Sequence, residues 1–346
     1  MAETFWQKLK KDISGGPEGR PLLVLAPMAD VTDASFRRVI AKYGKPDVTW
    51  TEFVSADGLV RATPEGKAKL MKDLIFDESE RPIVAQLFSS NPEYMKQAAA
   101  LCRELGFDGI DINMGCPDKG IEKQGAGAAM IKNPARAREV IRAAKEGAAF
   151  PDGRDPLPVS VKTRIGYNKD ELETWLPELL AEKPAVVTIH ARTRKEMSKV
   201  PARWEHVKRA VEIRDALQKD LPPEERTLIL GNGDVLDRED GIKQAQEARA
   251  DGTMLGRAIF GNPWLFSGKK DISVEEKLRV MVEHTNLFQE ILGTTKNFAI
   301  MKKHYKAYVA GWDGAAELRA QLMQTESAAE VEALITEYLK AYKARV

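Results

Sequence analysis

The chain contains few of the residues that cross-link small proteins or ligate metals. Only 2 of its 346 residues are cysteines and only 4 are histidines. The two cysteines, Cys102 and Cys116, do not form a CxxC pair, and the histidines are scattered along the chain. This pattern argues against a disulfide framework and a zinc cluster, so we expect no bound metal. A chain of this length can bury a large core without such links.

An excess of one charge is also absent. The 53 Lys and Arg residues are balanced by 52 Asp and Glu residues, which leaves a formal net charge of +1. Composition therefore excludes a histone-like or polybasic nucleic-acid binder. A whole-chain average does not exclude a local basic face.

Long apolar runs are missing as well. The longest, at 21–28 and 185–191, have the length of strands and fall far short of the ~20 residues that a membrane helix needs. Residues 1–12 are charged from Glu3 onward and contain no apolar segment of the kind that signal peptides carry. We therefore expect a cytoplasmic protein without a membrane partner.

What the chain does contain is a regular alternation of short apolar runs and helix candidates. The runs are near-continuous in β-branched and aliphatic residues, a pattern typical of parallel strands that are covered on both faces. Eight such runs lie at 22–26, 48–52, 83–87, 109–113, 159–163, 186–190, 227–231 and 252–256. Eight βα units with right-handed crossovers predict an α/β fold of the TIM (β/α)8 barrel class, with a doubly wound open sheet as the alternative.

The alternation stops near Pro263, and the sequence becomes helical from Ser273 onward. Ser273 with Glu276 has the spacing of a helix-start capping box. We therefore predict a small all-helical C-terminal domain. The expected division is an N-terminal extension at 1–19, a barrel at 20–268 and the helical domain at 273–346.

Polar residues and glycines follow every predicted strand. In a TIM barrel the active site lies at the C-terminal ends of the strands, so residues of this kind should meet there. They are Asp30, Glu52, Gln86, Asn113, Lys162, Arg164, His190, Arg192, Asn232, Gly233, Asp234, Gly256 and Arg257. Their recurrence at one level of the barrel predicts a functional site at that end.

The turns after the seventh and eighth strands favour a phosphate site. Gly231 and Gly233 allow close approach of a ligand to the backbone, and Arg257 can add a bidentate contact. Lys162 lies inside an apolar strand, where a cation needs a partner such as a phosphate or the negative edge of a reduced flavin. His190 stands opposite these turns, which favours a ligand contact over a purely structural role.

The two cysteines have different settings. Cys102 lies within an amphipathic helix candidate and is expected to pack as a small hydrophobic residue. Cys116 lies between Gly115 and Pro117 in a loop that follows a strand, where packing does not call for a thiol. A free thiol has a pKa of about 8.5, so it can serve as a general acid near neutral pH, whereas a nucleophile would need activation.

These residues together resemble the tRNA-dihydrouridine synthase family, flavin enzymes that reduce a uridine in tRNA. The similarity runs in order through LAPMADVTD, INMGCP, KQGAGAAMIKNP, VKTRIGYN, IHARTR, GNGDV, LGRAIFGNPWLF and MKKHYKAY, from about residue 22 to the helical region. The segment 193–204 departs from the family pattern, because it lacks the small glycine-containing turn of many relatives.

The resemblance implies FMN as cofactor, NADPH as reductant and tRNA as partner, with the helical domain binding the tRNA. It implies that FMN is held by Pro27, Met28, Ala29, Gln86, Lys162, His190, Asn232, Gly233, Asp234, Gly256 and Arg257. Cys116 corresponds to the proton donor for C5 of the uracil ring, after hydride transfer from the flavin to C6. Substrate contacts are expected at Asn113, Arg164, Arg192, Lys302, Lys303 and His304, and we expect a monomer.

The charge pattern supports the RNA partner independently of the resemblance. The segment 296–306 contains four lysines and one histidine and no acidic residue. Helical spacing turns Met301 and Tyr305 toward a core and leaves Lys302, Lys303 and Lys306 on an adjacent face for phosphates. A second stretch, 191–209, has seven Lys or Arg and two Glu.

Two other functions are compatible with parts of this pattern. One is an FMN barrel that reduces a free small molecule, which would have no use for a basic helical domain. The other is an RNA-binding protein that keeps the barrel without chemistry, which the presence of Cys116, Lys162 and His190 disfavours.

Overall fold

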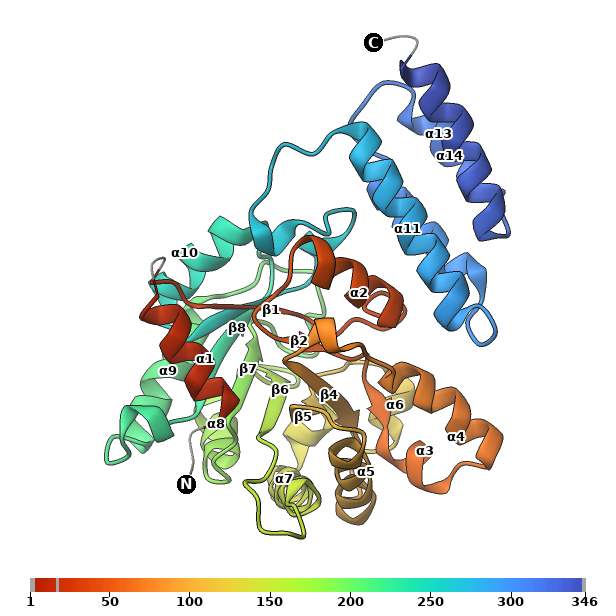
Figure 1. Cartoon of the computed structure of the whole chain (residues 1–346). Coiled ribbons are helices and arrows are strands. Elements are labelled where there is room, and N and C mark those ends of the chain that lie inside the picture. Colours follow the sequence, from red (N-terminus) through yellow and green to blue (C-terminus); the bar gives the residue numbers. More distant parts are fainter. Residues whose placement is uncertain (1–3, 17–18, 344–346) are drawn as a thin grey trace.

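The computed structural model describes residues 4–16 and 19–343 of the chain (Figure 1). Residues 1–3, 17 and 18 of the expected N-terminal extension, and 344–346 of the expected helical domain, lie outside the described residues. Two parts are visible in Figure 1: a barrel with helices around it, and a set of helices from the C-terminal part of the chain beside α2 (Ala34–Tyr43).

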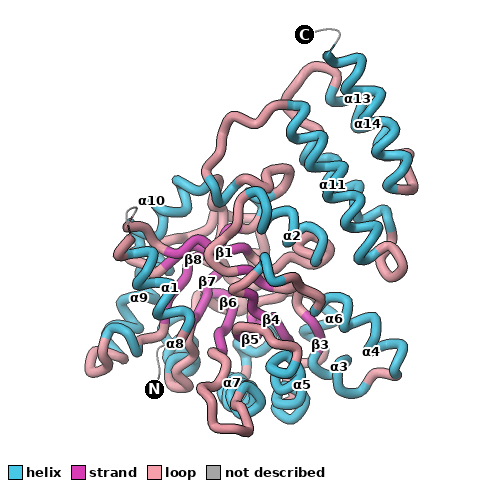
Figure 2. Tube along the Cα trace, viewed as in Figure 1, coloured by secondary structure: helices cyan, strands magenta, loops and turns pink. Residues whose placement is uncertain are grey.

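The barrel is built from parallel strands in the order β1-β9-β8-β7-β6-β5-β4-β2. A parallel bridge joins Val24 of the first strand in this order to Val48, the residue just before the last strand, and so brings the two ends of the sheet together. The strands are β1 (Leu22–Leu25), β2 (Thr49–Trp50), β3 (Val54–Ser55), β4 (Ile83–Phe88), β5 (Gly109–Met114), β6 (Val159–Arg164), β7 (Val186–His190), β8 (Leu228–Asn232) and β9 (Gly252–Leu255). Each of the eight predicted runs overlaps one strand of this order, so the TIM barrel is confirmed over the open sheet (Figure 2).

The second predicted strand is shorter than expected, and β3 was not predicted. The hydroxyl of Thr51 accepts a hydrogen bond from the backbone N–H of Gln86 at 3.0 Å. This side chain takes a place that a backbone carbonyl would hold in a continuing ladder, so regular pairing with β4 stops after Trp50 and resumes at β3.

Helices surround the strands (Figure 2). Besides α2 they are α3 (Ala56–Arg61), α4 (Pro64–Met71), α5 (Pro92–Glu104), α6 (Lys119–Lys123), α7 (Pro134–Ala148), α8 (Leu172–Leu180), α9 (Glu205–Leu217) and α10 (Arg238–Ala248). Short 3-10 turns are η1 (Lys72–Leu74), η2 (Glu78–Glu80), η3 (Gly127–Lys132), η4 (Pro223–Glu225), η5 (Arg257–Ile259), η6 (Leu265–Ser267) and η7 (Phe298–Ile300).

The N-terminal helix α1 (Phe5–Ser14) covers the end of the barrel where the strands begin. Trp6 is fully buried among side chains of the first strand residues, and its ring centroid lies 5.6 Å from that of Trp50. Phe5 approaches the first residue of β5, Gly109. Part of the predicted extension is therefore a plug for the barrel.

The C-terminal helical region consists of α11 (Val274–Leu292), α12 (Met301–Tyr308), α13 (Ala315–Leu322) and α14 (Ala328–Lys343). Ser273 caps α11 as predicted by accepting the N–H of Glu276 at 3.1 Å, while the Glu276 carboxylate turns outward to Lys269 at 2.7 Å. The region is docked on the barrel, because Phe36 and Val39 of α2 share one apolar cluster with Met281 of α11.

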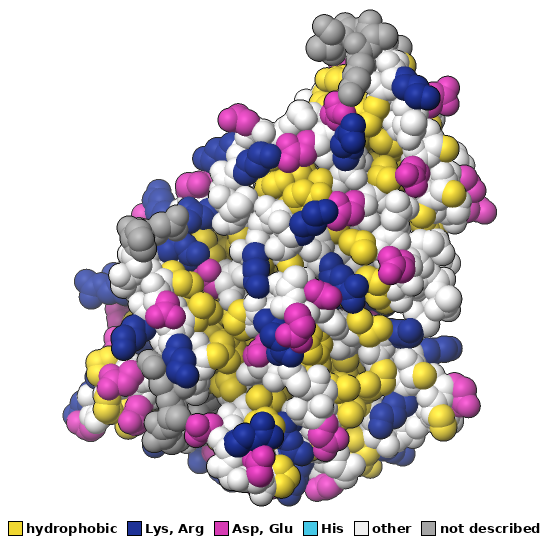
Figure 3. All heavy atoms as spheres, viewed as in Figure 1, with side chains coloured by type: hydrophobic (Ala, Val, Ile, Leu, Met, Phe, Trp, Pro, Cys, Tyr) yellow, Lys and Arg dark blue, Asp and Glu magenta, His cyan; other side chains and the backbone are white. Residues whose placement is uncertain are grey.

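Charges of both signs are interspersed on the face drawn in Figure 3, in keeping with the balanced composition. Among the described residues, no helix is both long and apolar enough to cross a membrane.

Candidate active site

A cavity of about 620 Å³ opens at the C-terminal ends of the barrel strands. This volume lies in the range of small-molecule and cofactor sites, about 300–1,000 Å³. Nine predicted cofactor residues line it together: Pro27, Met28, Lys162, His190, Asn232, Gly233, Asp234, Gly256 and Arg257. They come from five different strand ends, so these five polar ends meet at one cavity. Arg192, which was predicted to contact substrate, also lines the cavity; the lining residues that were not predicted are Ala26, Ser198, Val235, Leu236, Met254 and Ala258.

Two predicted cofactor residues lie outside the cavity wall. Ala29 is exposed beside Met28. Gln86 is fully buried; its amide nitrogen donates to Asp111 at 2.6 Å, and its amide oxygen accepts from Asn113 at 3.0 Å. Gln86 therefore belongs to a polar layer inside the barrel and supports neighbouring side chains.

Asp111 is a buried carboxylate in this layer that was not among the predicted site residues. It also accepts the Ser160 hydroxyl at 2.6 Å, and burial raises its pKa to about 6. The sequence did contain a signal for Asp111, namely a charged residue within an apolar strand. The same kind of signal identified Lys162.

Lys162 reaches from β6 toward the turn after β8. Its ammonium lies 3.3 Å from the amide oxygen of Asn232, whose amide nitrogen is fixed by the carbonyl of Met254 at 2.8 Å. Burial, and then the nearby Arg164 guanidinium, lower the pKa of Lys162 to about 8. Lys162 is thus a cation at neutral pH that lacks a full counter-charge, which suits an anionic ligand.

His190 is a neutral imidazole in the cavity wall. Burial, followed by the charges of Arg164 and Lys162, lowers its pKa well below the usual range. A guanidinium nitrogen of Arg192 lies 3.2 Å from Nε2. Because guanidinium groups only donate, Nε2 must accept and the ring proton must sit on Nδ1. His190 can therefore donate a hydrogen bond from Nδ1.

The turn after β8 has a conformation that glycine favours. Gly233 has φ of +129°, and a Cβ there would meet the Cβ of Ala202 at 2.8 Å. Its carbonyl accepts the indole N–H of Trp204 at 2.9 Å. Asp234 follows, bound by Arg192 and, at 2.6 Å, by Arg257; the bond from Arg192 is the main reason its pKa is lowered. The backbone at Gly233 and the guanidinium groups of Arg192 and Arg257 are thus held at the edge of the cavity.

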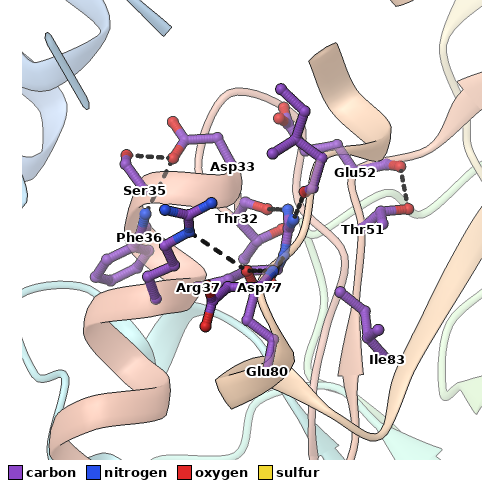
Figure 4. Close-up of polar contacts among 12 residues, drawn as sticks. Thr32, Asp33, Ser35, Phe36, Arg37, Thr51, Glu52, Asp77, Glu80 and Ile83 are labelled. Carbon is purple, nitrogen blue, oxygen red and sulfur yellow. Dashed lines mark hydrogen bonds and ion pairs between the residues drawn. The ribbon is translucent and has the colours of Figure 1, made fainter. Parts of the chain in front are cut away.

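The loop after β1 is supported by a buried ion pair (Figure 4). Arg37 donates to Glu80 at 2.7 Å and to the carbonyl of Thr32 at 2.8 Å, and the side chains of the pair are fully buried. Asp33 caps α2 by accepting the N–H of Phe36 at 3.0 Å. These contacts fix the segment that carries Pro27 and Met28 into the cavity wall.

The Cys116 loop is held by two residues that were predicted to contact substrate. The amide oxygen of Asn113 accepts the N–H of Gly115 at 3.1 Å and of Cys116 at 2.9 Å. Arg164 donates to the carbonyl of Gly115 at 2.7 Å and to the carbonyls of Thr193 and Met197, both at 3.2 Å. Both side chains therefore position the thiol loop.

Arg192, which was also predicted to contact substrate, is 2% exposed. It contacts His190 and Asp234 and donates to the carbonyl of Val200 at 2.6 Å.

The Cys116 side chain is half-buried and packs, with Phe53, against an apolar cluster of Phe88, Ile121 and Ala126. Burial raises the pKa of the thiol. At neutral pH Cys116 is therefore protonated and able to give up a proton, as the sequence predicted from the ordinary thiol pKa.

The basic segment of the helical region is only partly free. Lys303 and Lys306 are exposed and Lys302 is half-buried. His304 is fully buried between Phe36 and His284, so its predicted contact with substrate is wrong. The buried stripe of α12 runs through Met301, His304, Tyr305 and Tyr308, and position 304 belongs to it by the same helical spacing that buries 301.

Comparison with known proteins gives a consistent picture. The family model for dihydrouridine synthases matches residues 24–344. A protein of Bacillus subtilis (strain 168) named probable tRNA-dihydrouridine synthase 2 is 40% identical over 345 residues, 99% of this chain and 98% of the relative. A probable tRNA-dihydrouridine synthase of Staphylococcus aureus (strain MRSA252) is 39% identical over 341 residues, 98% and 96% of the two chains.

Among solved structures, a complex of 2-naphthoyl-CoA reductase is similar with a TM-score of 0.50 and 12% identity. The match covers 71% of this chain and 49% of the reductase. At this identity the likeness concerns the fold alone.

Proposed function

The chain belongs to the dihydrouridine synthase family, and on that premise we propose that it reduces the C5=C6 bond of uridines in tRNA, using FMN and NADPH. The observation that carries the proposal is the Cys116 thiol, whose pKa is raised by burial, on a loop hydrogen-bonded to Asn113 at the same barrel end as a cofactor-sized cavity.

The residues of the cavity fit FMN. Lys162 and Arg257 supply positive charge for a phosphate and for an anionic edge of the ring. Gly233 lets the backbone approach the ligand, at a place that a Cβ could occupy only by displacing Ala202. We assign FMN binding to the nine residues in the cavity wall, with Gln86 in a supporting role.

These residues would hold FMN, which, once reduced by NADPH, would supply the hydride for C6 of the uracil ring. Cys116 donates the proton for C5, because its raised pKa keeps the thiol protonated until negative charge develops on that carbon. Lys162 and Arg164 then stabilise the thiolate, since both cations act to lower the thiol pKa. The half-buried position of Cys116 lets solvent return the proton.

The tRNA partner is assigned to the mouth of the cavity and to the helical region. Lys302, Lys303 and Lys306 offer charge for backbone phosphates next to the β1 loop, where Lys303 lies 3.7 Å from Asp30. The target base must leave its stack to reach Cys116, at a cost of about a few kcal/mol.

The test is a reaction of the purified protein with FMN, NADPH and tRNA, in which dihydrouridine is measured by mass spectrometry and mapped by position. We expect dihydrouridine at defined uridines. A flavin-loaded protein that rapidly reduces an enone or free uracil and leaves tRNA unchanged would establish the small-molecule alternative. A protein that binds tRNA but no FMN would establish an RNA-binding role without chemistry.

A further inference from the structure

Lys296 ties the helical region to the barrel near the mouth of the cavity. Its ammonium lies 2.6 Å from the Glu52 carboxylate and 2.9 Å from that of Asp73. Glu52 follows β2 and Asp73 lies in η1, whereas Lys296 precedes η7, so the three side chains come from three separate segments. Lys296 is 14% exposed and Glu52 is 6% exposed, which makes this an enclosed ion triad.

The triad continues into the loop that lines the cofactor cavity. The second oxygen of Glu52 accepts the backbone N–H of Asp30 at 2.6 Å. Asp30 has φ of +52°, a conformation that few non-glycine residues adopt, and this bond helps to hold it. The same loop begins with Met28 of the cavity wall, whose N–H is bound by Thr32 at 2.9 Å. Figure 4 shows Glu52 and Thr32 in this neighbourhood.

The pKa shifts of Glu52 and Lys296 show that the triad is a partly buried set of charges and not an exposed ion pair. Burial raises the pKa of Glu52. Burial alone would lower the pKa of Lys296, but the two carboxylates outweigh it and raise that pKa. Loss of Lys296 would leave two carboxylates close together in an enclosed place, so the local arrangement depends on this cation.

A second bridge between the same two parts of the molecule provides a contrast. Lys42 of α2 pairs with Glu283 of α11 at 2.7 Å, but these side chains are 59% and 30% exposed. Exposed pairs of this kind contribute little and are screened by salt. Neither residue lines the cavity.

We propose that Lys296 is a positioning residue for the reaction with tRNA. Through Glu52 it fixes the helical region to the cofactor loop, so that a base presented by a tRNA on the helical region arrives in register with Cys116 and the cavity. The proposal rests on the proposed function. Small errors in the placement of reacting groups cost large factors in rate, so the effect of losing Lys296 falls on the reaction of bound tRNA.

The test uses the FMN-loaded full chain with Lys296→Met. We expect kcat at saturating tRNA to fall by about tenfold or more, while KM for tRNA changes by less than about threefold. The rate of flavin reduction by NADPH without tRNA, and the flavin content, should stay at the parent values. Lys296→Arg, which keeps the charge, should restore most of the rate.

The matched control is Lys42→Met, which removes the exposed ion pair between the same parts, leaves the hydrogen bond from Tyr43 to Glu283 at 2.6 Å, and should leave kcat within about twofold. Should Lys296→Met fail to fold, Glu52→Gln keeps an acceptor for Asp30 and removes the charge, and it should show the same fall in kcat. An unchanged kcat in the folded variants would overturn the proposal. So would a rise in KM alone, which would make Lys296 a phosphate contact. A parent protein that does not reduce tRNA at all would instead overturn the proposed function.

Discussion

His284 and His304 lie with their ring centroids 4.6 Å apart, fully buried where the helical region meets the barrel. Phe36 of α2 packs on both rings, with centroids 4.8 Å from each. None of the four ring nitrogens has a hydrogen-bond partner within the part of the chain that the structure describes. Each histidine is therefore held neutral in a place where a proton would be costly.

This pair predicts loss of stability in mild acid. Burial lowers the pKa of His304 to about 4 and that of His284 well below its usual range, whereas both are near 6.5 in the unfolded chain. Protonation therefore favours unfolding: stability is complete above about pH 6.5 and declines as the pH falls toward 4. His304 alone should cost about 2 kcal/mol between pH 7.5 and 5, which denaturant unfolding at several pH values would measure. His304→Phe should flatten the profile; an equally steep profile in that variant would contradict this origin.

The role of Cys116 predicts a block after cofactor reduction. Cys116→Ala should bind FMN and accept electrons from NADPH normally, because the thiol lies outside the cofactor cavity. Its reaction with tRNA should slow by about 10²–10⁴, the usual contribution of a general acid. Stopped-flow flavin absorbance, with and without tRNA, separates the two steps.

The matched control for Cys116 is the other cysteine. Cys102 is fully buried, and burial raises its pKa to about 12. Cys102→Ala should therefore retain turnover, and a thiol reagent should modify Cys116 first. Full turnover of Cys116→Ala would remove the thiol from the mechanism.

The parts of this site that could be predicted are those that depend on strand ends. Parallel strands bring their C-terminal ends to one edge, so residues such as Lys162, His190 and Gly233 could be placed together from eight apolar runs alone. The position of α1 could not be predicted in this way. A helix that covers the end of a barrel where the strands begin is recognised only when the arrangement of the strands is known.

Two errors arose where orientation or distant contacts decide the outcome. Met301 and Tyr305 face the core as predicted, but the buried stripe of α12 also includes His304, which was expected to contact substrate. Lys296 was counted as one of four lysines in an acid-free basic segment, but its partner Glu52 lies 244 residues earlier in the chain. Contacts over such separations follow from the packing of two regions and leave no local pattern.

The pKa of Lys162 predicts that FMN binding depends on pH. In the protein without ligand this cation loses its proton as the pH rises through about 8. An anionic ligand binds the protonated form, so its affinity should weaken as the pH rises above 8, by at most about tenfold per pH unit. Titration of the protein with FMN, followed by quenching of flavin fluorescence, would measure this. Lys162→Met should bind more weakly and lose the pH dependence; a dependence that persists in the variant would assign it to another group.

Gly233 should be the most sensitive glycine of the cavity. In Gly233→Ala the new methyl group would meet Ala202 at 2.8 Å and His190 at 3.2 Å, at a φ of +129°. The strain is of order 1–3 kcal/mol and falls on the turn that carries Asp234, so FMN affinity should drop by about one to two orders of magnitude. Gly153→Ala is the control, because that residue also has a positive φ, +79°, but has nothing within 4 Å of the added methyl and lies outside the cavity wall. If both substitutions lowered FMN affinity equally, backbone strain in general would explain the loss. The close approach of FMN to the backbone at Gly233 would then not be needed to explain binding.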